Sequence, residues 1–542
     1  MIPRSYLALG AFVVILWFAT LSLRPLFNTD EGRYAEIPRE MLASGDFVVP
    51  HLDGLAYIEK PPLQYWATAA SLALLGVTEL GARFYTALCA LVAVLAVGLV
   101  AARLYGASAG VRAGVVLASM LLFLAMGQLL TLDMSLSCYM TLALAAFLWA
   151  QDAAAKGAAR AERAAMLGAW LATALGVLTK GLIAAAIPGA VLVLYSLGTR
   201  DFSPWRRLHA ALGLPLFLAV AVPWFWLAAH RLPDFLDFFF VREHLERYLT
   251  PIANREEPFW YYAVVFALGT LPWTLPALRA LVGGWRRVGA GFQTALFLKI
   301  WVVFVLVFFS LSSSKLIPYI LPALPAVALL VSAAPEEVLK RDLQHTAFLT
   351  LAAALALGLV CLIAPRWVAP SERNGYFLAL VPAAAQVAAL LGASGLYVLS
   401  QRRRDLVRGV VFLGVGWCLA GLLLTRAAAA VAPVYSGVTL ARALPVVPAT
   451  APLYSVGTYD QTLPFYWRRT VRLVAYRGEL DYGLSRDPSA EIPSVDEFVA
   501  HWTAESGAYA VMERRTFEEL ERRGVPMREI ARDLNRVLVA RR

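Results

Sequence analysis

The chain has 542 residues, of which 60% are hydrophobic and 16% are charged, and its formal net charge at pH 7 is +11. Soluble domains average about 45–50% apolar and about 25% charged residues, so this composition excludes a wholly soluble protein and predicts a polytopic membrane protein. The basic residues fall in short loops between apolar runs, where they set membrane orientation, and nucleic-acid binding is therefore not expected. The four cysteines lie inside apolar runs without short paired spacing, which argues against a disulfide framework or a zinc cluster.

About thirteen apolar runs have the length that a helix needs to cross roughly 30 Å of hydrocarbon. The first, residues 5–23, resembles a signal peptide but lacks a small-residue cleavage site and precedes many further runs, so it is expected to be the first membrane helix. The other expected spans are residues 84–104, 107–129, 134–150, 164–178, 182–197, 209–229, 260–278, 294–311, 316–334, 346–363, 376–399 and 409–424.

Residues 62–77 form an apolar run whose length fits a span poorly. A helix of that length rises only about 24 Å, less than the hydrocarbon core, and the run carries Gln64, Tyr65 and Trp66. If the run lies in the interface or is re-entrant, Arg4 and the basic loops all fall on the cytoplasmic side, as the positive-inside rule requires. This topology predicts a cytoplasmic N-terminus, a large first periplasmic loop at 24–83 and a periplasmic C-terminus.

The last hundred residues differ in pattern from the rest of the chain. Short β-rich runs at 452–456, 470–475, 508–512 and 537–540 alternate with helical runs at 495–504 and 516–523. This alternation predicts a small α/β domain. The expected organisation is therefore an α-helical polytopic membrane domain, residues 1–430, followed by a soluble α/β domain, residues 431–542.

Two aspartates at the outer ends of expected spans, Asp30 and Asp133, are the candidate catalytic residues. A lone aspartate in such a place is more often a helix cap or an interface anchor. A carboxylate at the hydrocarbon edge is nevertheless costly unless it is paired or used. Two of them on one face could hold a metal, orient a sugar or act as a general base.

Lys60 is the leading candidate for binding a phosphate. Its ordinary role would be snorkelling to lipid headgroups, but a cation at this surface could also neutralise a lipid phosphate leaving group. Glu59 and His244 are candidate ligands for a divalent metal, although one histidine and one carboxylate form a weak signal. The other candidate substrate-binding residues are Glu31, Arg33, Tyr34, Tyr57, Arg242, Arg247, Lys315 and Tyr319. The segment carrying Arg242 and Arg247 could equally be an amphipathic surface helix.

Ten motifs occur in an order that resembles a known family. They are residues 30–36, 40–46 and 49–52, Tyr57 with residues 59–61, Leu132-Asp133, residues 178–181, Pro223-Trp224, Glu243-His244 with Arg247, residues 258–262 and residues 315–319. Together they resemble the bacterial lipid A 4-amino-4-deoxy-L-arabinose transferases, which use undecaprenyl phosphate aminoarabinose. That family belongs to the GT-C glycosyltransferases and is related to the protein O-mannosyltransferases. The match extends to about residue 334.

The resemblance implies an inner-membrane glycosyltransferase. Its donor would be undecaprenyl phosphate 4-amino-4-deoxy-L-arabinose, and its acceptor would be a phosphate of lipid A at the periplasmic face. This modification of lipid A would confer resistance to polymyxin and cationic peptides. By the resemblance, Asp30 and Asp133 serve the sugar, while Lys60, Arg247 and Tyr57 lie near the donor phosphate. Two alternatives remain: a GT-C enzyme that glycosylates protein or another glycan, and a lipid flippase or transporter, although transporters usually place ionisable residues at the midplane.

Overall fold

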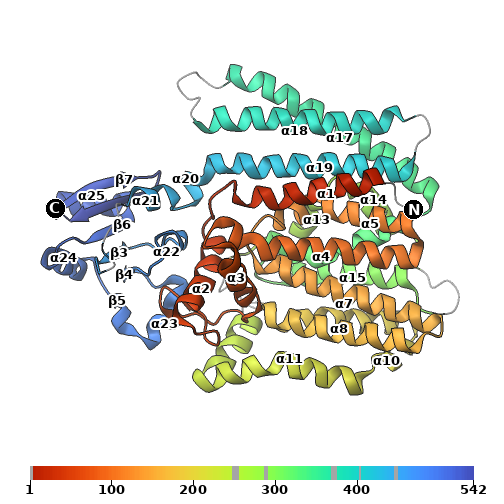
Figure 1. The fold of residues 1–542 in the computed structure, drawn as a ribbon, viewed down its shortest axis with the longest axis horizontal. Coiled ribbons are helices and arrows are strands. Elements are labelled where there is room, and N and C mark those ends of the chain that lie inside the picture. Colours follow the sequence, from red (N-terminus) through yellow and green to blue (C-terminus); the bar gives the residue numbers. More distant parts are fainter. Residues whose placement is uncertain are drawn as a thin grey trace. The chain divides into compact units, whose positions relative to one another are not determined.

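The computed structural model describes residues 4–246, 255–285, 291–367, 375–401, 405–444, 448 and 450–541 (Figure 1). The chain forms two compact units. The helical unit contains Met1–Thr20, Glu59–Gln64 and Tyr85–Thr425. The sheet unit contains Leu21–Ile58, Tyr65–Phe84 and Arg426–Arg542. Segments near the N-terminus therefore fold together with the C-terminal residues.

Among the described residues, 8 helices are long and apolar enough to cross a membrane. They are α4 (Glu79–Tyr105), α7 (Leu132–Ala155), α8 (Ala159–Lys180), α11 (Ala210–Arg231), α15 (Thr294–Leu311), α17 (Glu336–Trp367), α18 (Gly375–Ser400) and α19 (Leu406–Ala427). Shorter apolar helices include α1 (Arg4–Ala19), α5 (Ala107–Ser119), α9 (Ile183–Thr199) and α16 (Leu324–Ser332). Within the helical unit α8 packs between α7 and α11, as Figure 1 shows.

Three of the expected continuous spans are broken. Residues 107–129 form α5 and α6 (Leu121–Met126), residues 260–278 form α13 (Tyr261–Gly269) and α14 (Thr274–Val282), and residues 316–334 begin as the 3-10 helix Ile317–Ala323. Proline, which lacks an N–H and disrupts helices, occurs at the second and third breaks.

The first two breaks satisfy each other's polar groups. The Leu121 N–H donates to the carbonyl of Leu271 at 2.9 Å, and the Trp273 indole N–H donates to the Ser119 hydroxyl at 2.9 Å. Backbone that leaves a helix at membrane depth needs such partners inside the protein, because hydrocarbon offers none. Each break is therefore tolerated because of the other.

The first expected loop is largely ordered. It contains α2 (Asp30–Ser44), the hairpin β1 (His51–Leu52) and β2 (Leu55–Ala56), and α3 (Leu63–Leu75). The hairpin turn is Asp53-Gly54, with φ of 57° and 79°, a pair suited to a tight two-residue turn. The Glu40 carboxylate accepts the N–H groups of both turn residues, at 2.6 and 2.9 Å, so α2 fixes the hairpin.

Asp53 makes the stability of the sheet unit depend on pH. Its side chain is buried, its Oδ1 accepts the Val471 N–H at 2.8 Å, and burial raises the pKa of its carboxyl to about 8. Between about pH 4 and pH 8 the folded chain therefore holds a proton that the unfolded chain releases, so stability falls as pH rises through this window. Asp53→Asn is expected to flatten this dependence and to raise the thermal midpoint at pH 8, measured in detergent at pH 5 and pH 8. If the thermal midpoint changed equally between pH 5 and pH 8 in the variant and in the original protein, this assignment would be contradicted.

The C-terminal residues form a six-stranded sheet with the order β5-β4-β3-β6-β8-β7. The strands are β3 (Leu453–Val456), β4 (Arg472–Val474), β5 (Glu491–Ile492), β6 (Tyr509–Glu513), β7 (Met527–Arg532) and β8 (Arg536–Arg541). Strands β5, β4, β3 and β6 pair in parallel, and β8 pairs antiparallel with both β6 and β7. All four expected strands are confirmed, as are the helices α24 (Val495–Ala504) and α25 (Arg514–Arg522). The sequence missed β5 and β7, the two edge strands.

Candidate functional site

Glu31 is the centre of a buried ion cluster in the sheet unit. Its carboxylate accepts from the Arg24 guanidinium at 2.5 and 3.0 Å and from Arg83 at 2.8 and 2.9 Å. Burial alone would raise the pKa of Glu31, but Arg24 and Arg83 hold it well below its usual range. Arg83 also donates to the carbonyls of Leu21, Arg24 and Pro25. The cluster fixes the chain just before α2, and the expected substrate-binding role of Glu31 remains a prediction.

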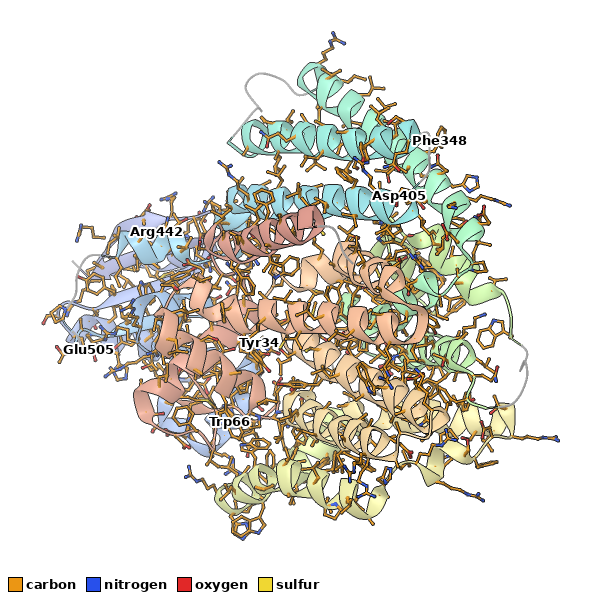
Figure 2. All side chains as sticks on the ribbon, turned by 45° about the vertical axis from the view of Figure 1, so that its right-hand side comes forward. Tyr34, Trp66, Phe348, Asp405, Arg442 and Glu505 are labelled. Atoms are coloured by element: carbon orange, nitrogen blue, oxygen red, sulfur yellow. The ribbon has the colours of Figure 1, made fainter. Side chains whose placement is uncertain are left out.

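Asp30 lies beside this cluster but is open to solvent. Its side chain is 48% exposed and its Oδ1 lies 3.8 Å from Nη2 of Arg33. The Arg33 guanidinium donates to the Tyr57 hydroxyl at 3.0 Å and forms an ion pair with Glu479 at 2.5 Å. Arg33 also lies against the Tyr34 ring, which Figure 2 labels, at 5.7 Å. Three expected site residues, Asp30, Tyr34 and Tyr57, therefore gather around a fourth, Arg33.

Glu479 also belongs to this group, although the sequence did not predict it as a site residue. It follows Arg477 and Gly478 in a short 3-10 helix, Gly478–Leu480, between β4 and α23 (Asp481–Arg486). No local motif marks it, because its partner Arg33 is far away in the sequence. Only the folding of the first loop with the C-terminal residues brings the two together.

Asp133 forms a second group, inside the helical unit. It lies in the first turn of α7, and its Oδ1 is 2.5 Å from Nζ of Lys180, the last residue of α8. The Lys180 ammonium lies 4.8 Å from the centroid of the Tyr319 ring, a cation–π distance. Both charged side chains are mostly buried, at 13% and 18% exposure. Asp133 is thus a paired carboxylate whose position depends on Lys180.

Lys60 is also in the helical unit and is paired with a carboxylate. Its ammonium lies 2.9 Å from Oε2 of Glu243 and 3.9 Å from Oε2 of Glu59, and it donates to the Glu59 carbonyl at 2.8 Å. The Lys60 and Glu243 side chains are each 13% exposed. A bound phosphate at Lys60 would therefore have to compete with Glu243.

The remaining expected site residues differ in how they are held. Lys315 is buried, and its backbone N–H donates to the carbonyl of Arg255 at 3.0 Å. Arg242 is exposed, and its guanidinium lies 5.6 Å from the centroid of the Phe238 ring. Arg247 and the side chain of His244 lie outside the described residues. No group of three or more metal-ligating side chains occurs in the described parts of the chain. The metal site at Glu59 and His244 remains a prediction, as does the pairing of Asp30 with Asp133 in one site.

Comparison with known proteins decides the family. The curated undecaprenyl phosphate-alpha-4-amino-4-deoxy-L-arabinose arabinosyl transferase of Aeromonas salmonicida is 33% identical over 428 residues, 76% of each chain. The second such transferase of Sodalis glossinidius is 31% identical over 531 residues, 92% of this chain and 90% of the relative. The chain belongs to the aminoarabinose arabinosyl transferase family.

Solved structures and family models agree with the aminoarabinose transferase assignment. The crystal structure of ArnT from Cupriavidus metallidurans bound to undecaprenyl phosphate matches with a TM-score of 0.90 and 33% identity, over 100% of this chain and 98% of that one. Residues 3–239 match the dolichyl-phosphate-mannose-protein mannosyltransferase model, and residues 440–541 match the aminoarabinose transferase C-terminal domain. The expected GT-C fold class is confirmed. The chain is a multi-pass inner-membrane glycosyltransferase.

Proposed function

We propose that this chain transfers 4-amino-4-deoxy-L-arabinose from undecaprenyl phosphate to a phosphate of lipid A at the periplasmic face of the inner membrane. The observation that carries the proposal is the match along its whole length to ArnT bound to undecaprenyl phosphate, at 33% identity. The topology proposed with it places the N-terminus in the cytoplasm and residues 24–83 and 431–542 in the periplasm.

The charges of the helical unit suit the departure of a lipid phosphate. Cleavage of the anomeric C–O bond builds positive charge on the sugar and negative charge on the leaving undecaprenyl phosphate, so groups that meet those charges accelerate the step. In this proposal Lys60 leaves its ion pair with Glu243 and binds the donor phosphate. The other residues of the proposed donor site are Arg242, Arg247, Lys315 and Tyr319. Asp133 is held by Lys180, and its proposed role is to stabilise the positive charge that develops on the sugar.

The acceptor needs little activation. A phosphate monoester is already largely ionised near neutral pH, so it attacks without a strong general base. Asp30 then serves to hold the sugar amine, which is cationic, and its 48% exposed carboxylate is open to such a group. Arg33, with Tyr34 and Tyr57 around it, offers a cation for the acceptor phosphate.

Replacing Asp30 by alanine tests this role. Loss of a charged hydrogen bond to the substrate amine is expected to lower transfer about tenfold or more, with little change in thermal midpoint because Asp30 is half-exposed. Sugar transfer is measured with purified protein in detergent, and Asp30→Glu is the conservative control. Wild-type activity in Asp30→Ala would exclude the assignment.

Lys180 is expected to act as a positioning residue. Lys180→Gln removes the cation that holds Asp133, and transfer is expected to fall about tenfold, an effect of one charged hydrogen bond. Lys180→Arg keeps the charge and is expected to recover part of the activity. The kcat should fall more than the donor KM rises, because Asp133 acts on the reacting sugar. A variant with normal kcat would show that the ion pair only supports the fold.

The acceptor chemistry is tested with purified protein and donor lipid. Product is expected with lipid A and absent with enzymatically dephosphorylated lipid A, because the attacking group is a phosphate oxygen. The surface variant Arg515→Gln on α25 serves as the matched control, and it should behave as the original protein. Transfer to the dephosphorylated acceptor would instead indicate a hydroxyl acceptor and would overturn this part of the proposal.

A further inference from the structure

A cavity of about 250 Å³ lies within the sheet unit, where the start of α4 meets α21 (Val438–Ala443) and α22 (Thr462–Trp467). Its charged lining consists of Arg442, Arg468 and Glu79, and its apolar lining includes Val77, Val438 and Phe465. None of these residues has a role in the proposed transfer. We call this space the headgroup cavity, and its charged lining needs an explanation of its own.

The two arginines are unengaged cations. Both are exposed, and within the described part of the chain neither guanidinium makes an ion pair or a hydrogen bond. Figure 2 labels Arg442 on α21. Guanidinium groups bind phosphate oxygens in a bidentate manner, and two of them beside one cavity form a site for a phosphate.

The carboxylate opposite them is fixed in place. The Tyr466 hydroxyl donates to Oε1 of Glu79 at 3.1 Å and itself accepts the Leu26 N–H at 2.8 Å. Glu79 has no cationic partner among the described residues. A purely anionic ligand would be repelled by this carboxylate, whereas a ligand with both a phosphate and an ammonium group would satisfy all three charges.

The cavity lies beside the start of a candidate membrane helix. Glu79 is the first residue of α4, a helix of 27 residues that is long and apolar enough to cross a membrane. Just before the cavity, Leu74 and Leu75 at the end of α3 are 83% and 40% exposed. Exposed leucines beside the start of a membrane helix indicate contact with lipid, and phospholipid phosphates lie at this depth.

We propose that the headgroup cavity binds a zwitterionic phospholipid, with Arg442 and Arg468 on its phosphate and Glu79 on its amine. The lipid is an aminoalkyl phosphodiester of the phosphatidylethanolamine type. Its glycerol end rests on Val77 and Phe465, and its acyl chains leave along α3 and α4. The site is independent of the sugar transfer proposed above.

Native mass spectrometry of the full chain, released from nanodiscs with equimolar phosphatidylethanolamine and phosphatidylglycerol, tests the proposal. The original protein is expected to retain phosphatidylethanolamine at least about threefold over phosphatidylglycerol, and Arg442→Gln with Arg468→Gln to retain about tenfold less of it. Glu79→Gln, which Tyr466 can still hold, is expected to lose the preference between the two lipids but to keep a bound lipid. Arg515→Gln and the charge-conserving pair Arg442→Lys with Arg468→Lys are the controls and should retain the lipid.

Several results would overturn the proposal. Equal retention of the two lipids by the original protein would remove the role of Glu79, and unchanged retention in the double glutamine variant would remove the role of the arginines. Displacement of the lipid by an equal concentration of free phosphoethanolamine would show a site for a soluble headgroup. Sugar transfer is assayed in parallel, so failure here is distinguishable from failure of the proposed function.

Discussion

Replacing Lys60 by alanine is expected to lower kcat for sugar transfer about 100-fold or more, and to raise the KM for the donor lipid. Removing a group that stabilises developing negative charge in an active site typically costs about 10²–10³ in kcat. Lys60 is mostly buried and is held by Glu243 at 2.9 Å, so its ammonium is oriented before the phosphate arrives. Both constants are measured with purified protein in detergent over a range of donor concentrations.

The controls separate this role from membrane anchoring. Lys60→Arg keeps the charge and is expected to retain part of the activity, whereas a lysine that only reaches for headgroups could be replaced by alanine without loss. Glu243→Gln removes the competing carboxylate and is expected to lower the donor KM. Unchanged kcat and KM in Lys60→Ala would remove Lys60 from the donor site.

Glu31→Gln is expected to have the largest effect on stability. It leaves the buried cations Arg24 and Arg83 without their countercharge, and breaking a buried pair in this way costs about 3–5 kcal/mol. Because the pKa of Glu31 is held well below its usual range, its contribution is present above about pH 4 and is lost only as the pH falls below that. The loss of stability is therefore expected to be constant from pH 5 to pH 8.

The thermal midpoint in detergent measures this effect. Glu518→Gln removes an exposed carboxylate from α25 and is the matched control, with an expected change within about 0.5 kcal/mol. A midpoint for Glu31→Gln equal to that of this control would show that the cluster does not hold the chain before α2.

The sequence predicted the elements whose pattern is local. Apolar runs of sufficient length marked the long helices, and the β-branched stretches of the last hundred residues marked β3, β4, β6 and β8. The helix α2 was not predicted, because its charges, Gly32 and Pro38 hide the helical pattern. Gly32 has a non-local reason to be glycine: a Cβ there would lie 2.6 Å from the carbonyl carbon of Gln461.

The sequence predicted individual residues of the candidate site but not the ion pairs that hold them. The motifs identified Asp30, Asp133 and Lys60, yet not Glu479 as the partner of Arg33, nor Lys180 and Glu243 as the partners of Asp133 and Lys60. Each partnership joins residues far apart in the chain, and single-sequence periodicity contains no information on such pairs. The free-energy cost of placing a carboxylate near hydrocarbon predicts that it has a cationic partner, but it does not identify that partner.

The central claim is tested most directly by the mass spectrum of lipid A from a bacterial strain that lacks its own aminoarabinose transferase but still makes the donor lipid. Expression of this chain is expected to produce lipid A carrying 4-amino-4-deoxy-L-arabinose on a phosphate, and expression of Lys60→Ala at the same level is expected to produce almost none. Unmodified lipid A with the original chain, despite normal expression and membrane insertion, would contradict the account.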